Sequence, residues 1–164
     1  GVINAAAVTT ITGTFAEINA LYALGANGTI VGLGNEAITI SGILTVAQAN
    51  TLAAQTTGVI TATISEGDMA TLAGLNETGN AYSITITDAS VAASALNTLN
   101  AKTTGVVTVQ ATTITGTATD ISAAYAANTA GTITGLGNEA VTVTDVTVIA
   151  SFPKPVIVPA ALDV

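Results

Sequence analysis

The sequence predicts an α/β solenoid, in which parallel strands and short helices alternate with one helix in each of about five to six coils. Three observations lead to this prediction. The chain repeats itself, its extended segments alternate Ile or Val with Thr, and most of these segments lead into a short stretch that carries helix-capping signals. A repeat unit of roughly 20–50 residues is the signature of a solenoid or an array.

The longest repeat runs without a gap. Residues 11–42 (ITGTFAEINALYALGANGTIVGLGNEAITISG) match residues 114–145 (ITGTATDISAAYAANTAGTITGLGNEAVTVTD), and a shorter repeat links 50–64 to 97–111. Strand–helix units of this size stack most simply as a right-handed coil with parallel strands in chain order. The predicted coils are 1–25, 26–55, 56–76, 77–102 and 103–128, followed by a half coil without a helix at 129–147.

Six segments are predicted to be extended, because their apolar residues alternate with Thr at the period of a half-buried strand. These segments are 2–12, 29–40, 58–64, 81–87, 105–115 and 132–144. Two of them contain a Gly-rich interruption, at 32–35 and 135–138. Each interruption predicts a bend between two short strands.

Five helices are predicted, near 15–25, 45–55, 66–75, 90–101 and 118–128. Four of them begin with capping-box patterns or close variants: Thr14 with Glu17, Thr45 with Gln48, Ser65 with Asp68, and Thr117 with Asp120. Each helix has one narrow apolar stripe: Ile18, Leu21 and Tyr22; Val46, Ala49 and Leu52; Met69, Leu72 and Ala73; Val91, Ala95 and Leu99; Ile121, Ala124 and Tyr125. Helices this short must pack on the strands to be stable.

Composition excludes several classes of function. The chain is 49% hydrophobic, but no apolar run approaches the roughly 18–20 residues of a membrane span. The net charge is −8 and the basic residues are Lys102 and Lys154, so we expect no nucleic-acid partner. The absence of Cys and His removes the thiolate nucleophile, the disulfide and the commonest general base.

The ten carboxylates do not suggest an enzyme. A glycosidase needs two cooperating carboxyl groups, and no pair stands out from the regular spacing of the acids. Glu17, Asp68 and Asp120 fall at the third position of predicted helices, where a carboxylate satisfies free N–H groups. We therefore expect no catalytic residue.

The bends contain the candidate metal ligands, which are Asn35, Glu36, Asn138 and Glu139. Calcium takes oxygen ligands of this kind, but Asn and Gly also stabilise tight bends without a metal. The chain has no EF-hand loop and no calcium-binding nonapeptide. Stabilisation of the bend is the favoured interpretation and calcium binding is the alternative.

A second candidate surface is formed by threonines that alternate along the strands: Thr39, Thr61, Thr63, Thr85, Thr87, Thr108, Thr142 and Thr144. Thr is a good strand former whose hydroxyl faces water, and this alone explains the pattern. The functional alternative is a regular hydroxyl and methyl lattice that binds glycan or ice. An unbroken lattice would favour binding, whereas interrupted rows would favour a scaffold.

The C-terminal segment 148–164 departs from the repeat and holds all three prolines. Because Pro cannot donate to a strand ladder, this segment is predicted to be a cap, a linker or an extended docking arm. The docking residues would be Pro155, Val156, Ile157, Val158 and Pro159, since an extended peptide can add to a sheet edge.

Residues 1–147 resemble repeat units of very large secreted cell-surface proteins of marine cyanobacteria, which are giant repetitive adhesin-like proteins. The resemblance lies in TTGVV, in ALNTLNAKTTG and in TTITGTATDISAAYAANTAGTITGLGNEAVTVTD. It implies an extracellular or cell-surface location and a structural role. The calcium-binding nonapeptides of such giants are missing here.

We therefore expect a non-catalytic structural segment of a surface or filament-forming protein. The chain has no initiator Met, and Gly1-Val2-Ile3 matches Gly58-Val59-Ile60, so we expect it to be part of a longer array. Its predicted partners are further copies or neighbouring repeats, joined head to tail through open strand edges.

Overall fold

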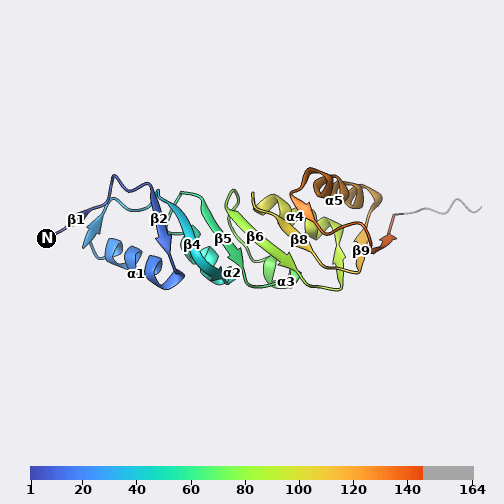
Figure 1. Cartoon of the computed structure of the whole chain (residues 1–164), viewed down its shortest axis with the longest axis horizontal. Helices are drawn as coiled ribbons and strands as arrows, with labels where there is room; N and C mark the ends of the chain where they lie inside the picture. The colour runs from blue at the N-terminus through green and yellow to red at the C-terminus, as the bar shows by residue number, and fades with distance from the viewer. Residues whose placement is uncertain (146–164) are drawn as a thin grey trace, which may run out of the picture.

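A computed structural model describes residues 1–145, which form an elongated mixed α/β structure (Figure 1). Its helices are α1 (Phe15–Ala26), α2 (Val46–Ala53), α3 (Met69–Leu72), α4 (Ala93–Lys102) and α5 (Ala118–Ala130). Its strands are β1 (Ile3–Asn4), β2 (Thr10–Gly13), β3 (Ile30–Val31), β4 (Ala37–Leu44), β5 (Ile60–Ile64), β6 (Ala81–Ile86), β7 (Ser90–Ala92), β8 (Val107–Val109), β9 (Thr113–Gly116), β10 (Ile133–Thr134) and β11 (Ala140–Val143). Within residues 1–145, no helix has the length and apolar character needed to cross a membrane.

Every strand pair in the described residues is parallel, and neighbouring strands follow chain order. The largest sheet has the order β2-β4-β5-β6-β8-β10, a second has the order β7-β9-β11, and β1 pairs with β3. Parallel neighbours need a crossover connection, and each crossover here contains one of the five helices. The prediction of a parallel α/β chain with one short helix in each crossover is confirmed at this level.

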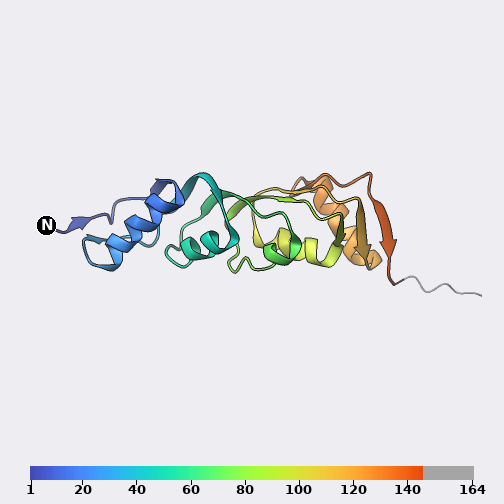
Figure 2. The same cartoon turned by 90° about the horizontal axis from the view of Figure 1, so that it is seen from below.

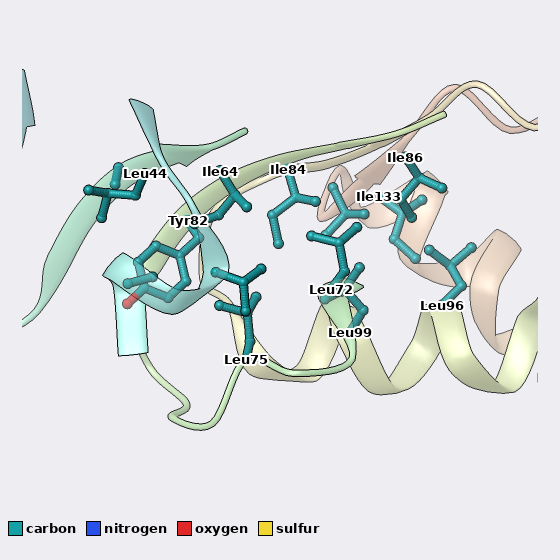
Figure 3. Close-up of a cluster of buried hydrophobic side chains, with 14 of the residues drawn as sticks. Leu44, Ile64, Leu72, Leu75, Tyr82, Ile84, Ile86, Leu96, Leu99 and Ile133 are labelled. Atoms are coloured by element: carbon teal, nitrogen blue, oxygen red, sulfur yellow. The ribbon is translucent and has the colours of Figure 1, made fainter. Parts of the chain in front are cut away.

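The core lies between the strands and the helices, which follow one another along one side of the strands (Figure 2). Strand β5 shows how alternation creates this core, because its Ile60, Ala62 and Ile64 are buried while the threonines between them are exposed. Figure 3 shows Ile64, Ile84 and Ile86 on the strands facing leucines that come from helices and the turns beside them. Ile and Leu side chains from the two layers therefore fill the space between helices and strands.

The bends and most of the helix starts are confirmed. Each Gly-rich interruption separates two short strands, β3 from β4 and β10 from β11. Thr14 and Thr45 form complete capping boxes, and the Thr117 side chain accepts a hydrogen bond from the Asp120 N–H. These signals depend only on neighbouring residues, which explains why the sequence reveals them.

The predicted start of the third helix is wrong. Helix α3 spans only Met69–Leu72, and its N-cap is Asp68, which accepts from the Thr71 N–H at 2.8 Å. The late start has a backbone reason, because the Gly67 carbonyl accepts a hydrogen bond from the Thr87 N–H at 2.9 Å. The chain passes close to the next strand at this point before it can turn into the helix.

The predicted helix at 90–101 also begins too early. Ser90–Ala92 form strand β7, which pairs with β9 and places Val91 beside Ile114. Helix α4 therefore starts at Ala93, and its buried face is Ala93, Leu96 and Leu99 instead of the predicted Val91, Ala95 and Leu99. Strand pairing outweighs the helical spacing here because it satisfies the backbone of the segment.

Candidate functional site

The first bend is held by a buried carboxylate. Glu36 lies directly before β4 and has no exposed surface. The Tyr22 hydroxyl, from helix α1, donates to its Oε2 at 2.8 Å, and the Gly34 N–H donates to both carboxylate oxygens at 2.9 Å. Glu36 therefore joins the helix, the bend and the following strand.

The second bend repeats this arrangement 103 residues later. The Tyr125 hydroxyl, from helix α5, donates to Glu139, and the N–H groups of Gly137 and Asn138 donate to its Oε2 at 2.7 and 2.9 Å. Glu139 is only partly buried, because no described strand covers β11 on its outer side. The two bends thus share one hydrogen-bond arrangement, which is fully buried at Glu36 and partly buried at Glu139.

These contacts lower the pKa values of the two carboxylates and raise that of Tyr22. Burial opposes ionisation of Glu36, but the Gly34 N–H and the Tyr22 hydroxyl outweigh it, so the pKa of Glu36 lies below its ordinary value. Glu139 follows the same pattern, with Tyr125 as the leading hydrogen-bond donor, and its pKa is also lowered. Burial and the Glu36 contact raise the pKa of Tyr22 to about 12. Both carboxylates are therefore held in the ionised form.

The candidate metal ligands do not surround a common position. Asn35 and Asn138 are exposed, whereas Glu36 and Glu139 point into their own bends and accept hydrogen bonds there. Among the described residues, no group of three or more His, Cys, Asp or Glu gathers as a metal site. The contacts favour stabilisation of the bend, which was the favoured interpretation, and calcium binding stays an untested alternative.

A second device joins successive crossovers through the Thr-Thr-Gly motif. The Thr56 side chain, which is 7% exposed, donates to the Glu36 carbonyl at 2.7 Å and accepts from the Gly58 N–H at 3.0 Å. Thr103 repeats these contacts with the Tyr82 carbonyl at 2.8 Å and the Gly105 N–H at 2.9 Å. We call these contacts the Thr-Thr-Gly clamp. The sequence analysis did not predict them, although both copies of the motif lie inside the shorter repeat.

The glycine of the motif is required by close approach. A Cβ atom on Gly58 would lie 2.1 Å from the Glu36 carbonyl oxygen, and one on Gly105 would lie 2.3 Å from the Tyr82 carbonyl oxygen. Real Cβ atoms do not approach this closely. The motif therefore combines a buried hydroxyl with the one residue type that lets the two backbones meet.

A third device uses carboxylates across neighbouring crossovers. Glu66 accepts from the Val46 N–H at 3.1 Å, Asp88 from the Met69 N–H at 2.7 Å, and Asp145 from the Ala118 N–H at 2.9 Å. Each of these N–H groups belongs to the first residue of a helix and has no partner within that helix. The acid that follows one strand thus caps the helix that precedes it in the chain.

The threonine rows are real but interrupted. Thr12, Thr39 and Thr61 lie side by side on adjacent strands, and the row then meets Ala81. A second row joins Thr85, Thr108 and Thr134.

The remaining predicted threonines do not extend these rows into one lattice. Thr63 lies between Ile43 and Ser83. Thr142 pairs with Thr115, whose other neighbour is Ala92. Thr87 and Thr144 are exposed at strand ends, and their N–H groups donate to the carbonyls of Gly67 and Gly116.

The predicted docking residues Pro155, Val156, Ile157, Val158 and Pro159 lie outside the described residues.

Two hollows on the surface of residues 1–145 contain at most one carboxylate each. One of about 340 Å³ lies between α1 and β3 and is lined by Tyr22, Ile30 and Leu33 among others. Another of about 290 Å³ contains Glu77 beside Thr56 and Asn80.

Comparisons with protein-family models, with curated proteins and with solved structures found no match to this chain.

Proposed function

We propose that this chain is a parallel strand–helix solenoid that serves as a non-catalytic structural segment of an extracellular surface or filament-forming protein. The observation that carries this proposal is that contacts join successive crossovers of the chain. Strands follow chain order, and the Thr-Thr-Gly clamp and the carboxylate caps each connect one crossover to the next. Nearest-neighbour contacts of this kind are how solenoids are stabilised.

The non-catalytic role is supported by the work that the acids already do. Glu17 accepts from the Thr14 N–H, and Asp68 caps α3. The bend carboxylates hold tyrosines, and three further acids cap helices across crossovers. A carboxylate that satisfies backbone N–H groups is poorly placed to transfer protons or to attack a substrate.

Extended shape and location provide the test. Small-angle X-ray scattering of the purified chain should give a pair-distance distribution with one short cross-section and a long tail. Antibodies against the chain should label intact, unpermeabilised cells of the source organism. A compact distribution would argue against the solenoid, and labelling that needs permeabilised cells would argue against an extracellular role.

A second candidate function is binding of glycan or ice through the threonines. The observation in its favour is the exposed row of Thr12, Thr39 and Thr61, which are in register on three strands. The interruption at Ala81 makes this the weaker proposal. Substitution of Thr39 by Lys should abolish retention on a crystalline polysaccharide if this row binds it, and should change nothing if the chain is a scaffold.

A further inference from the structure

We propose that two copies of this chain join end to end, with β1 and β2 of one copy adding as parallel strands to β10 and β11 of the other. This inference rests on the proposed function, because it names the partner of the open sheet edges of the solenoid. The contact is heterologous, since different surfaces of the two copies meet. Contacts of this kind that do not close into a ring extend into filaments.

The β11 end exposes apolar side chains whose repeat counterparts are buried. Val141 and Val143 are 45% and 37% exposed, whereas Ile38 and Ile40, at the same positions of the first repeat, are 0% and 9% exposed. The sheet topology explains the difference, because β5 pairs with β4 on that side and no described strand pairs with β11 there. The first repeat thus indicates that a further parallel strand belongs on this edge.

The β1 end has the matching deficiency. Ile3 is 58% exposed, whereas Val107, its counterpart in the later Gly-Val-Val segment, is fully buried. Val107 lies between β6 and β10, while β1 pairs with β3 alone among the described strands. A strand on the outer side of β1 would restore the arrangement found around Val107.

The spacing of the two strand pairs allows both to form at once. Ile3 and Thr10, the first paired residues of β1 and β2, are seven positions apart. Ile133 and Ala140, the first paired residues of β10 and β11, are also seven positions apart. When Ile3 of one copy lies beside Ile133 of another, Thr10 therefore lies beside Ala140 without a bulge.

The backbone donors of β11 suit this addition. In the first repeat, Ala37 donates its N–H to the strand before β4 (to Thr9), and Ile38 donates to the strand after it (to Val59, 2.9 Å). Ala140 likewise donates backwards, to Thr112. By the same alternation, the Val141 N–H faces the edge that no described strand occupies. That donor is available to a β2 strand from a second copy.

Cysteine cross-linking tests the register. The chain has no cysteine, and the proposed register places Thr12 of one copy beside Thr142 of another. Both side chains are exposed, and their strands lie toward opposite ends of the chain (Figure 1). The full-length double variant Thr12→Cys/Thr142→Cys should therefore form a ladder of disulfide-linked oligomers under mild oxidation. Thr12→Cys/Thr85→Cys, whose two sites are also exposed but are not paired by the register, is the control and should stay largely monomeric.

A matched pair of variants tests the edge itself. Val141→Pro removes the outward N–H but keeps the N–H groups through which β11 pairs with β9. Pro is tolerated at a strand edge. Val141→Thr keeps the N–H and a β-branched side chain. In sedimentation equilibrium of the full chain, Val141→Pro should weaken association at least tenfold, whereas Val141→Thr should associate within threefold of the parent chain.

Three results would overturn the proposal. The first is a monomer at every concentration. The second is cross-linking of Thr12→Cys/Thr142→Cys that is no faster than cross-linking of the Thr12→Cys/Thr85→Cys control. The third is quantitative intramolecular disulfide formation in Thr142→Cys/Ile157→Cys, which would identify the C-terminal segment of the same chain as the occupant of the edge. Sedimentation velocity separates these outcomes from failure of the solenoid, because an elongated monomer would retain the high frictional ratio of a rod.

Discussion

The Tyr22 hydroxyl donates to the Glu36 carboxylate at 2.8 Å, and Tyr125 holds Glu139 in the same way. Each pair joins the side of a helix to the bend that follows it, 14 residues later in the chain. Tyr82 has a contrasting position, because its hydroxyl is buried without a hydrogen-bond partner among the described residues. The tyrosines thus offer a direct comparison of a paired and an unpaired buried hydroxyl.

Tyr22→Phe should lower the free energy of unfolding by about 1–3 kcal/mol, because it leaves the buried Glu36 carboxylate with one donor fewer. Tyr82→Phe, the matched control, should be neutral or stabilising, since it removes a hydroxyl that has no partner. Urea unfolding followed by circular dichroism measures both values. Equal losses in the two variants would show that the Tyr22 hydroxyl contributes only packing.

The tyrosines should ionise at a higher pH in the folded chain than in the unfolded chain. The pKa values of Tyr22, Tyr82 and Tyr125 are raised to about 12: burial is the main cause at the first two, and the Glu139 hydrogen bond is the main cause at Tyr125. Because the folded pKa exceeds the ordinary value of 10, this contribution to stability is complete below pH 10 and is lost as the pH rises toward 12. The chain has no Trp, so tyrosinate absorbance reports the titration cleanly. A native midpoint near 10 would contradict the burial of Tyr22 and Tyr82 and the hydrogen bond between Tyr125 and Glu139.

Acid should destabilise the fold. Hydrogen bonds from Thr14 lower the pKa of Glu17, and the Thr71 N–H lowers that of Asp68. The pKa values of Glu36 and Glu139 are lowered as described above. A depressed folded pKa stabilises above the unfolded value and loses that effect as the pH falls. The free energy of unfolding should therefore be nearly constant from pH 7 to about 5 and should decrease below the ordinary values of 4.5 and 3.8.

Glu36→Gln provides the control for the acid prediction, because Gln keeps the shape of the side chain and does not titrate. Unfolding in urea at a series of pH values should show a shallower loss of stability for this variant than for the parent chain. An identical pH dependence in the two chains would mean that Glu36 does not contribute to acid sensitivity.

Asp88→Ala should cost about 0.5–2 kcal/mol, because the Met69 N–H at the start of α3 loses its acceptor. Helix α3 has only four residues, so the loss should be concentrated there and should raise amide exchange at Met69 and Ala70. Glu77→Ala is the control, since Glu77 is exposed, and should stay within about 0.5 kcal/mol of the parent chain. Unchanged amide exchange in α3 would refute the capping role of Asp88.

Gly58→Ala should destabilise by about 1–3 kcal/mol or more, because the added Cβ atom would lie 2.1 Å from the Glu36 carbonyl oxygen. Gly1→Ala adds the same group where no atom lies within 4 Å and should leave stability unchanged. Thermal unfolding of both variants provides the measurement. If Gly58→Ala melted with the parent chain, the two backbones would not be in contact at the Thr-Thr-Gly motif.

Much of the local structure could be predicted from the sequence. The alternation of Ile with Thr in β5, the capping boxes at Thr14 and Thr45, and the Gly-rich bends all depend on residues within one turn or one strand. Physical rules of short range therefore determine them. The internal repeat adds the expectation of parallel crossovers, which the strand order bears out at the level of the sheets.

Only the tertiary structure decided which groups meet. Glu36 was a candidate metal ligand in the sequence, and it became a bend carboxylate because helix α1 brings Tyr22 beside it. Asp88 meets the first N–H of α3 because strand register sets how far each crossover advances. Val91 joined a strand because β9 offered a partner for its backbone. The sequence by itself determined most of the elements and their order, since these follow from local periodicity and capping, but it did not reveal strand β7. The three-dimensional packing decided the contacts between crossovers, because those depend on register between segments that lie 14 to 27 residues apart.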